Sequence, residues 1–216
     1  MGLGARKMPT FVYVSRGLFV TGSKKQNNIQ THEELSGFIT NVAFEDADYD
    51  GNSYRKIIIT VTDPEDGKPY HLGISVNNGY GSRIQKMLPC VDFGDQVSIS
   101  LAYEEDTKKC SAFIRQSTGQ VKQYWTKDDK KDLPEMECQE FAGKKMWDAS
   151  KQNEYLEEFL TGPVLDQVKL ANEARGPIAE KTAPSSGGGD MDYAEEPPSG
   201  EDLMSDGQGF GDSDPF

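Results

Sequence analysis

The sequence predicts a mainly β protein, in which a small barrel of strands is followed by helices and by a tail without stable structure. Three observations lead to this prediction. Between residues 35 and 117, several segments alternate hydrophobic and polar residues, as strands with one buried face do. One short segment within this region has helical spacing instead. Beyond residue 181, the chain contains nine Asp and Glu residues and no Lys or Arg, a composition that cannot support a packed core.

Three strands joined by two tight turns are predicted first. Residues 35–44 form an apolar run, in which Gly37 is expected to mark a bulge where the strand bends around the barrel. In residues 54–62, hydrophobic side chains recur at every second position, and the same alternation returns at 70–76. The turns are predicted from Asp, Gly and Pro residues at 50–51 and 64–67.

A short helix and two further strands complete the predicted core. Residues 81–88 have helical spacing, and the helix is expected to end before Pro89. Strands follow at 97–103 and 110–116, with a polar turn between them. The order of three strands, one helix and two strands is that of the OB-fold, a partly open five-stranded Greek-key barrel that binds oligonucleotides on one sheet face and in its loops. We therefore predict an OB-fold core.

Two helices are predicted after this core. Following Pro134, the first is indicated by its hydrophobic residues, which are Trp147, Tyr155, Leu156, Phe159 and Leu160. This helix is expected to break at residues 162–163, a Gly-Pro pair. The second helix, at 164–174, is expected to end at the next Gly-Pro pair, residues 176–177.

The predicted elements divide the chain into four parts. Before the core, apolar runs at 11–14 and 18–20 predict a strand or hairpin that extends the sheet or closes one end of the barrel. The parts are an N-terminal extension at 1–34, the OB-fold core at 35–134, a helical segment at 135–176 and a tail at 177–216.

The acidity of the chain is concentrated in its tail. The net charge is −13, of which residues 182–216 contribute −9. The remaining residues contain 27 acidic and 23 basic side chains, a net charge of only −4. A glycine run at 187–189 and a proline pair at 197–198 also disfavour packing, so the tail is predicted to be disordered.

The last residues of the tail form a distinct motif. Asp212, Asp214, Pro215 and Phe216 place one aromatic ring among carboxylates. The ring can fill an apolar pocket of a partner while the carboxylates meet a basic rim. This ending resembles that of bacterial and bacteriophage single-stranded-DNA-binding proteins, whose acidic tails finish in carboxylates followed by Pro-Phe. The chain differs from the bacterial pattern at Asp214, where a hydrophobic residue is usual.

The resemblance implies a non-enzymatic protein that acts in DNA replication, recombination and repair. Such a protein covers and protects single-stranded DNA, and it recruits partner enzymes through the terminal tail residues. No cofactor and no metal are expected, and a homo-oligomer is compatible with the resemblance. The chain contains no apolar run long enough to span a membrane and no signal peptide, so we expect it in the cytoplasm of a bacterium or an infected host cell, associated with the nucleoid. The widely spaced cysteines suit a reducing compartment and predict no disulfide; they are Cys90, Cys110 and Cys138.

Candidate DNA-binding residues are aromatic side chains, which stack on unpaired bases, and cations, which contact phosphates. They are expected on the outer sheet face, in loops and on the short helix. The set is Tyr54, Arg55, Lys56, His71, Arg83, Lys86, Phe113, Arg115, Lys122, Tyr124 and Trp125. Core packing is the alternative for Tyr54, Phe113 and Trp125. On their strand, Phe113 and Arg115 are predicted to share the face opposite Ala112 and Ile114.

Other functions have weaker support in the sequence. Asp46, Asp48 and Asp50 resemble the start of a calcium loop, but Ile57 stands where the loop needs Glu, so a hairpin turn is favoured. The histidines and cysteines lack the spacing of zinc ligands. The chain contains no phosphate-binding loop and no nucleophile motif that would predict an enzyme. The remaining alternative is an OB-like module that binds protein or RNA.

Overall fold

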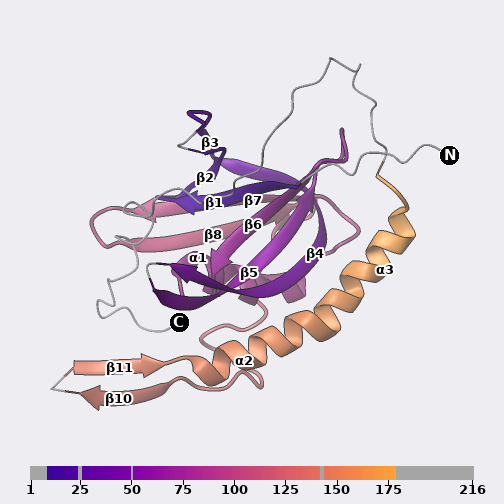
Figure 1. Cartoon of the computed structure of the whole chain (residues 1–216). Coiled ribbons are helices and arrows are strands. Elements are labelled where there is room, and N and C mark those ends of the chain that lie inside the picture. Colours follow the sequence, from indigo (N-terminus) through magenta and orange to yellow (C-terminus); the bar gives the residue numbers. More distant parts are fainter. Residues whose placement is uncertain (1–8, 24–25, 50, 142–143, 179–216) are drawn as a thin grey trace.

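A computed structural model of the chain describes residues 9–23, 26–49, 51–141 and 144–178 (Figure 1). The strands of its large sheet are β1 (Thr10–Ser15), β2 (Leu18–Thr21), β3 (Gln30–His32), β4 (Glu34–Tyr49), β5 (Asn52–Thr62), β6 (Pro69–Ser75), β7 (Val97–Glu104), β8 (Lys109–Gln116) and β9 (Gly119–Gln120). The other elements are α1 (Gly79–Met87), the 3-10 helix η1 (Leu88–Cys90), β10 (Glu137–Phe141), β11 (Lys144–Asp148), α2 (Ser150–Phe159), the π-helical turn η2 (Leu160–Val164) and α3 (Leu165–Arg175). The predicted mainly β class is confirmed. None of the helices in this part of the chain is long and apolar enough to cross a membrane.

The large sheet has nine strands in the order β3-β2-β1-β6-β5-β4-β7-β8-β9. All neighbouring pairs are antiparallel except β1 and β6, which are parallel. The five predicted core strands correspond to β4 to β8, with α1 between β6 and β7 as expected. The hairpin of β1 and β2 extends the sheet beyond β6, as predicted. Within the described residues no ladder joins β6 to β8, so closure of the predicted barrel is not shown, and these strands belong to one large mixed sheet.

The long strand β4 changes its partner at Gly37. Its first four residues pair with β7, and the rest of the strand pairs with β5. Gly37 has a φ of 151°, and a Cβ atom at this position would lie 2.4 Å from the carbonyl oxygen of Thr62. Only glycine fits there. The bulge follows between Ile39 and Asn41. Strand β4 therefore contains a bulge, but it begins two residues after the glycine at which it was predicted.

The residues that alternate along β5 form the centre of the hydrophobic core. Ile57, Ile59 and Val61 are fully buried. The same core receives side chains from the neighbouring strands and from the C-terminal helices, among them Leu72, Ile99, Ile114, Leu160, Val164 and Val168. Burying one such side chain stabilises the fold by about 1.5–3 kcal/mol. The C-terminal helices are thus part of the folded body.

These helices form one continuous run, whereas the sequence predicted a break. The π-helical turn η2 contains Pro163 and joins α2 directly to α3. The predicted break at Gly162 and Pro163 is wrong, because a π-helical turn accommodates a residue without a backbone N–H donor. Leu160 and Val164 anchor this turn in the core. The run ends at Gly176, which has a φ of 71°, as predicted.

Trp147 lies in strand β11 and not in the predicted helix. It pairs with Cys138 of β10 in a two-stranded sheet that is separate from the large one. Figure 1 shows this hairpin projecting beyond the start of α2. The helical prediction failed because the spacing between Trp147 and Tyr155 is ambiguous. It is compatible with one helix, and it is equally compatible with a strand that is followed by a helix. The Trp147 side chain is 46 % exposed.

Candidate nucleic-acid interface

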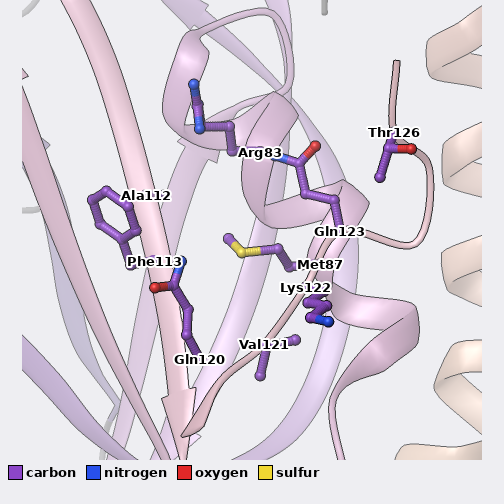
Figure 2. Close-up of a pocket in the computed structure, with 9 residues that line it drawn as sticks. All are labelled: Arg83, Met87, Ala112, Phe113, Gln120, Val121, Lys122, Gln123 and Thr126. Atoms are coloured by element: carbon purple, nitrogen blue, oxygen red, sulfur yellow. The ribbon is translucent and has the colours of Figure 1, made fainter. Parts of the chain in front are cut away.

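A surface hollow lies between α1, β8, β9 and the segment that follows β9 (Figure 2). Its volume is about 490 Å³. Its walls combine two cations, one aromatic ring, two amides and one hydroxyl with a small apolar floor. The lining residues are Arg83, Met87, Ala112, Phe113, Gln120, Val121, Lys122, Gln123 and Thr126. Three of the predicted DNA-binding residues, Arg83, Phe113 and Lys122, therefore come together in one place.

Two glycines allow α1 to approach the sheet closely enough to form one wall of this hollow. A Cβ atom at Gly79 would lie 2.9 Å from Cβ of Cys110, and one at Gly81 would lie 2.1 Å from the carbonyl oxygen of Ser75. The helix begins at Asn78, whose Oδ1 accepts a hydrogen bond of 2.7 Å from the Gly81 N–H. The chain thus needs these glycines for close packing of α1 against β8 and the end of β6.

Strand β8 forms the opposite wall, with the alternation that the sequence predicts. Ala112 and Ile114 are buried at 3 % and 0 % exposure, while Phe113 is half-buried and Arg115 exposed on the other face. The chain then turns, and β9 returns along β8 so that Gln120 pairs with Arg115. This return brings the residues after Gln120 to the hollow.

The cations at this surface are available to a ligand. Among the described residues, Arg83, Arg115 and Lys122 form no ion pair with a carboxylate. Arg115 lies close enough to Glu34 to contribute to the lowered pKa of that carboxyl, which depends mainly on hydrogen bonds from serines. Lys86 is different, because it is buried at 8 % exposure. Burial lowers the pKa of its amine, with a smaller effect from the charge of Arg83. Lys86 is therefore not exposed enough to contact DNA, contrary to the prediction.

Trp125 was predicted to contact DNA, but it is a core residue with 1 % exposure and cannot stack on a base. Its ring centroid lies 4.8 Å from that of Tyr124 and 5.2 Å from that of Phe159. Trp125, Leu133 and Leu156 are the buried residues of a second, smaller core. This core attaches the segment after β9 to helix α2.

Tyr124 is half-buried in the same cluster. The amine of Lys131 lies 3.1 Å from the centroid of its ring. Its backbone N–H donates a hydrogen bond of 2.7 Å to the carbonyl oxygen of Lys86, which ties the segment to α1. Nearby, burial and a hydrogen bond to Asp132 raise the pKa of Tyr155 to about 12. Tyr124 thus packs against the second core and does not line the hollow.

A second group of predicted residues lies on β5 and β6, and its cations are paired. Tyr54, Lys56 and His71 are on the outer face, whereas Arg55 is on the opposite face, that of Ile57. Arg55 donates two hydrogen bonds to Glu157 of α2, with Nε to Oε2 at 3.0 Å and Nη2 to Oε1 at 2.5 Å, and its Nη1 lies 2.9 Å from Oδ1 of Asp46. The bonds with Glu157 are the main cause of a raised pKa of Arg55. Lys56 lies 3.3 Å from Glu45. A DNA phosphate would have to compete with these carboxylates.

The rest of this outer face is aromatic and neutral. Tyr54 is half-buried beside Ala47 of β4. His71 contacts Phe11 of β1 edge-to-face, with 5.6 Å between the ring centroids. Burial lowers the pKa of His71, against a smaller opposing effect of Glu45. This face therefore offers rings but few free cations, in contrast to the hollow.

The sequence did not single out Gln120, Gln123 or Thr126 as site residues. The alternation of rings and cations at 122–127 suggested a groove, but uncharged polar residues carry no such pattern. The useful signal was Gly119, which has a φ of 115° and allows the chain to turn back along β8. A predicted hairpin there would have located the following residues beside Phe113.

The structure also bears on the calcium loop and the zinc site that were considered as alternatives. Asp46 and Asp48 lie in strand β4, with Asp46 bound to Arg55, and Asp50 is outside the described residues. The part of the chain that the structure describes contains no group of three or more His, Cys, Asp or Glu side chains that could hold a metal ion. The predicted partner-binding residues also lie outside it; they are Asp212, Asp214, Pro215 and Phe216.

The chain matches no model of a known protein family, no curated protein and no solved structure. The residues of the hollow are therefore the evidence for the kind of ligand that this protein binds. The hollow combines a ring, unpaired cations and amides on a rigid sheet and helix. Such a combination suits a polyanion with planar aromatic groups.

Proposed function

We propose that this chain is a single-stranded-DNA-binding protein, with the hollow between α1 and β8 as its principal contact surface. The observation that carries the proposal is the convergence of Phe113, Arg83 and Lys122 in one hollow, with Arg115 beside Phe113 on β8. The strand order of β4 to β8, with α1 between β6 and β7, supports an OB-type core for this function. The protein covers unwound DNA during replication, recombination and repair.

The arrangement favours single strands over duplex DNA. Phe113 offers a ring face, and a base can stack on it only when it has left the double helix. The cations around the ring suit the phosphates on either side of the stacked base. Each phosphate contact releases counterions from the strand, so binding must weaken as the salt concentration rises.

The overall acidity of the chain does not oppose this proposal. Residues 1–181 have a net charge of only −4, and unpaired cations gather at the hollow. The local field, and not the net charge, governs where a polyanion binds. The two predicted cations of β5, Arg55 and Lys56, are already occupied by carboxylates.

Removing the two cations of the hollow should test the proposal directly. The double variant Arg83→Ala, Lys122→Ala is expected to bind a fluorescent dT decamer more weakly. The slope of log affinity against log salt should fall in magnitude by about 1.4, since each phosphate contact on a single strand contributes about 0.7. The matched control is Lys151→Ala, Lys169→Ala, which removes two exposed cations on α2 and α3. Equal slopes for the two double variants and the unchanged protein would contradict the proposed surface.

We also propose that the acidic tail competes with DNA for the cations of the hollow. Deletion of residues 182–216 removes nine negative charges, so binding of the dT decamer should tighten several-fold at low salt. The difference should shrink above about 0.15 M salt, where the Debye length is about 8 Å. Affinities of both forms at low and high salt measure this effect. A variant with the nine acids replaced by Asn and Gln controls for tail length, and unchanged or weaker binding after deletion would contradict competition.

A further inference from the structure

Gln120 and Gln123 bring two unpartnered side-chain amides to the hollow. Among the described residues, neither amide makes a hydrogen bond, although other glutamines of the chain do. The amides that donate to backbone carbonyl oxygens are those of Gln85, Gln116 and Gln152, at 3.1, 2.7 and 3.0 Å. Some glutamine amides of the chain thus serve as structural donors, whereas those of Gln120 and Gln123 line the hollow without a partner among the described residues and are open to a ligand.

A phosphate group cannot use such amides fully. It offers only acceptor oxygens at neutral pH, while each glutamine amide carries two N–H donors and one acceptor oxygen. The edge of a nucleobase presents donors and acceptors side by side, which is the pattern that an amide complements. Arg83 and Lys122 already supply donors for phosphates. The two amides are thus suited to a base.

The hollow, with a volume of about 490 Å³, is large enough to take one base. Figure 2 shows Phe113 and Gln120 on one side of the hollow and Gln123 on the other, with Met87 between them and Arg83 above. Met87 is 3 % exposed and forms an apolar floor. A base that stacks on the ring of Phe113 has both glutamines among its neighbours, because all three residues line the same hollow.

Of adenine, thymine and cytosine, adenine alone has edges that can occupy both amides at once. Its N6 amino group has two hydrogens, and the acceptors N1 and N7 lie on either side of it. Each glutamine can therefore accept one N6 hydrogen and donate to one ring nitrogen, as in the known pairing of Gln with adenine N6 and N7. Cytosine has one such donor and acceptor pair, at N4 and N3, and thymine has a single donor, N3–H, so each of these bases can occupy only one amide in this way. We propose that the hollow is an adenine-preferring base site read by Gln120 and Gln123, an inference that rests on the proposed single-stranded-DNA binding.

The test compares fluorescent dA, dT and dC decamers by anisotropy at one salt concentration, with the full chain and three variants. Gln120→Leu and Gln123→Leu remove one amide each while keeping similar volume, and Gln167→Leu on α3 is the matched control. The bases of a dA decamer stack on one another, which lowers its affinity for any protein. We therefore calculate the ratio of dA affinity to dT affinity for each protein, and then divide the ratio of a variant by the ratio of the unchanged protein. One lost bidentate contact should lower this quotient about 5- to 150-fold for Gln120→Leu and for Gln123→Leu. The quotient should stay near one for Gln167→Leu.

The outcomes separate this inference from the proposed function. If all three decamers bind and the quotient stays near one in both hollow variants, base reading by the glutamines is refuted while single-strand binding stands. An equal fall in all three affinities would also refute it, because it would indicate a general contact. If the unchanged protein binds none of the decamers, the proposed function fails and the base site fails with it.

Discussion

Replacing Phe113 by alanine should weaken the binding of single-stranded oligonucleotides by about 5- to 150-fold, the equivalent of about 1–3 kcal/mol for one stacked base. The ring is the one aromatic side chain that lines the hollow within the described residues, and it is half-buried on the outer face of β8. Its loss should leave the cations in place. The salt dependence should therefore keep its slope while the affinity falls at every salt concentration, and titration of a fluorescent dT decamer by anisotropy measures both quantities.

Two control variants make this prediction specific. Phe113→Tyr keeps a ring of similar size, so it should retain most of the affinity. Phe11→Ala removes a different exposed ring, 42 % exposed, which contacts His71 on the outer face of β6. If Phe11→Ala loses affinity and Phe113→Ala does not, the strand binds the β1–β6 face, and the hollow is not the principal contact surface. Urea unfolding of all three variants establishes that the comparison is made on folded protein.

The parts of the fold that the sequence predicted are those set by neighbours along the chain. The alternation that turns Ala112 inward and Phe113 outward depends only on the geometry of one strand. The same holds for Gly176, where a left-handed residue ends α3. Local patterns also gave the order of β4 to β8 with α1 after β6. They could not give the partner of β6, because its pairing with β1 joins segments that lie far apart in the sequence.

The predicted site residues that proved unavailable have partners that are distant in sequence. Arg55 is held by Glu157, which lies 102 residues further along the chain. Trp125 is buried against Leu156 and Phe159 of α2, again far from it in sequence. A cation or ring that alternates with polar residues produces the same sequence pattern in two cases. Its side chain can face solvent, or it can face a helix that is formed by residues much further along the chain. Sequence periodicity alone therefore cannot distinguish a binding residue from one that attaches two elements.

The hollow itself depends on three segments that meet only in the folded chain. Arg83 comes from α1, Phe113 from β8, and Lys122 from the segment after β9. The residue types were recognisable, but their meeting depends on the approach of α1 to β8 at Gly79 and on the return of the chain after Gly119. The sequence thus supplied the candidates, and the tertiary structure selected among them.

The largest effect on stability is expected for Trp125→Ala, which should lower the free energy of unfolding by about 3–5 kcal/mol. The side chain is 1 % exposed and packs against Tyr124, Phe159 and Tyr155, with ring centroids at 4.8, 5.2 and 6.1 Å. Its removal leaves a cavity between the segment after β9 and α2. A domain of this size is typically stable by only about 5–15 kcal/mol, so the loss is a large fraction of the total. Urea unfolding followed by circular dichroism measures it.

The chain provides its own matched control in its second tryptophan. Trp147 is 46 % exposed, so Trp147→Ala should change the free energy of unfolding by about 0.5 kcal/mol or less. Equal destabilisation by the two substitutions would contradict the assignment of Trp125 to a buried core. Because Trp125 attaches the segment that carries Lys122 and Gln123, its loss should also weaken DNA binding in conditions where the variant remains folded. Full stability loss with unchanged affinity would instead mean that this segment does not contact the strand, since a wall of the hollow cannot lose its support and keep its geometry.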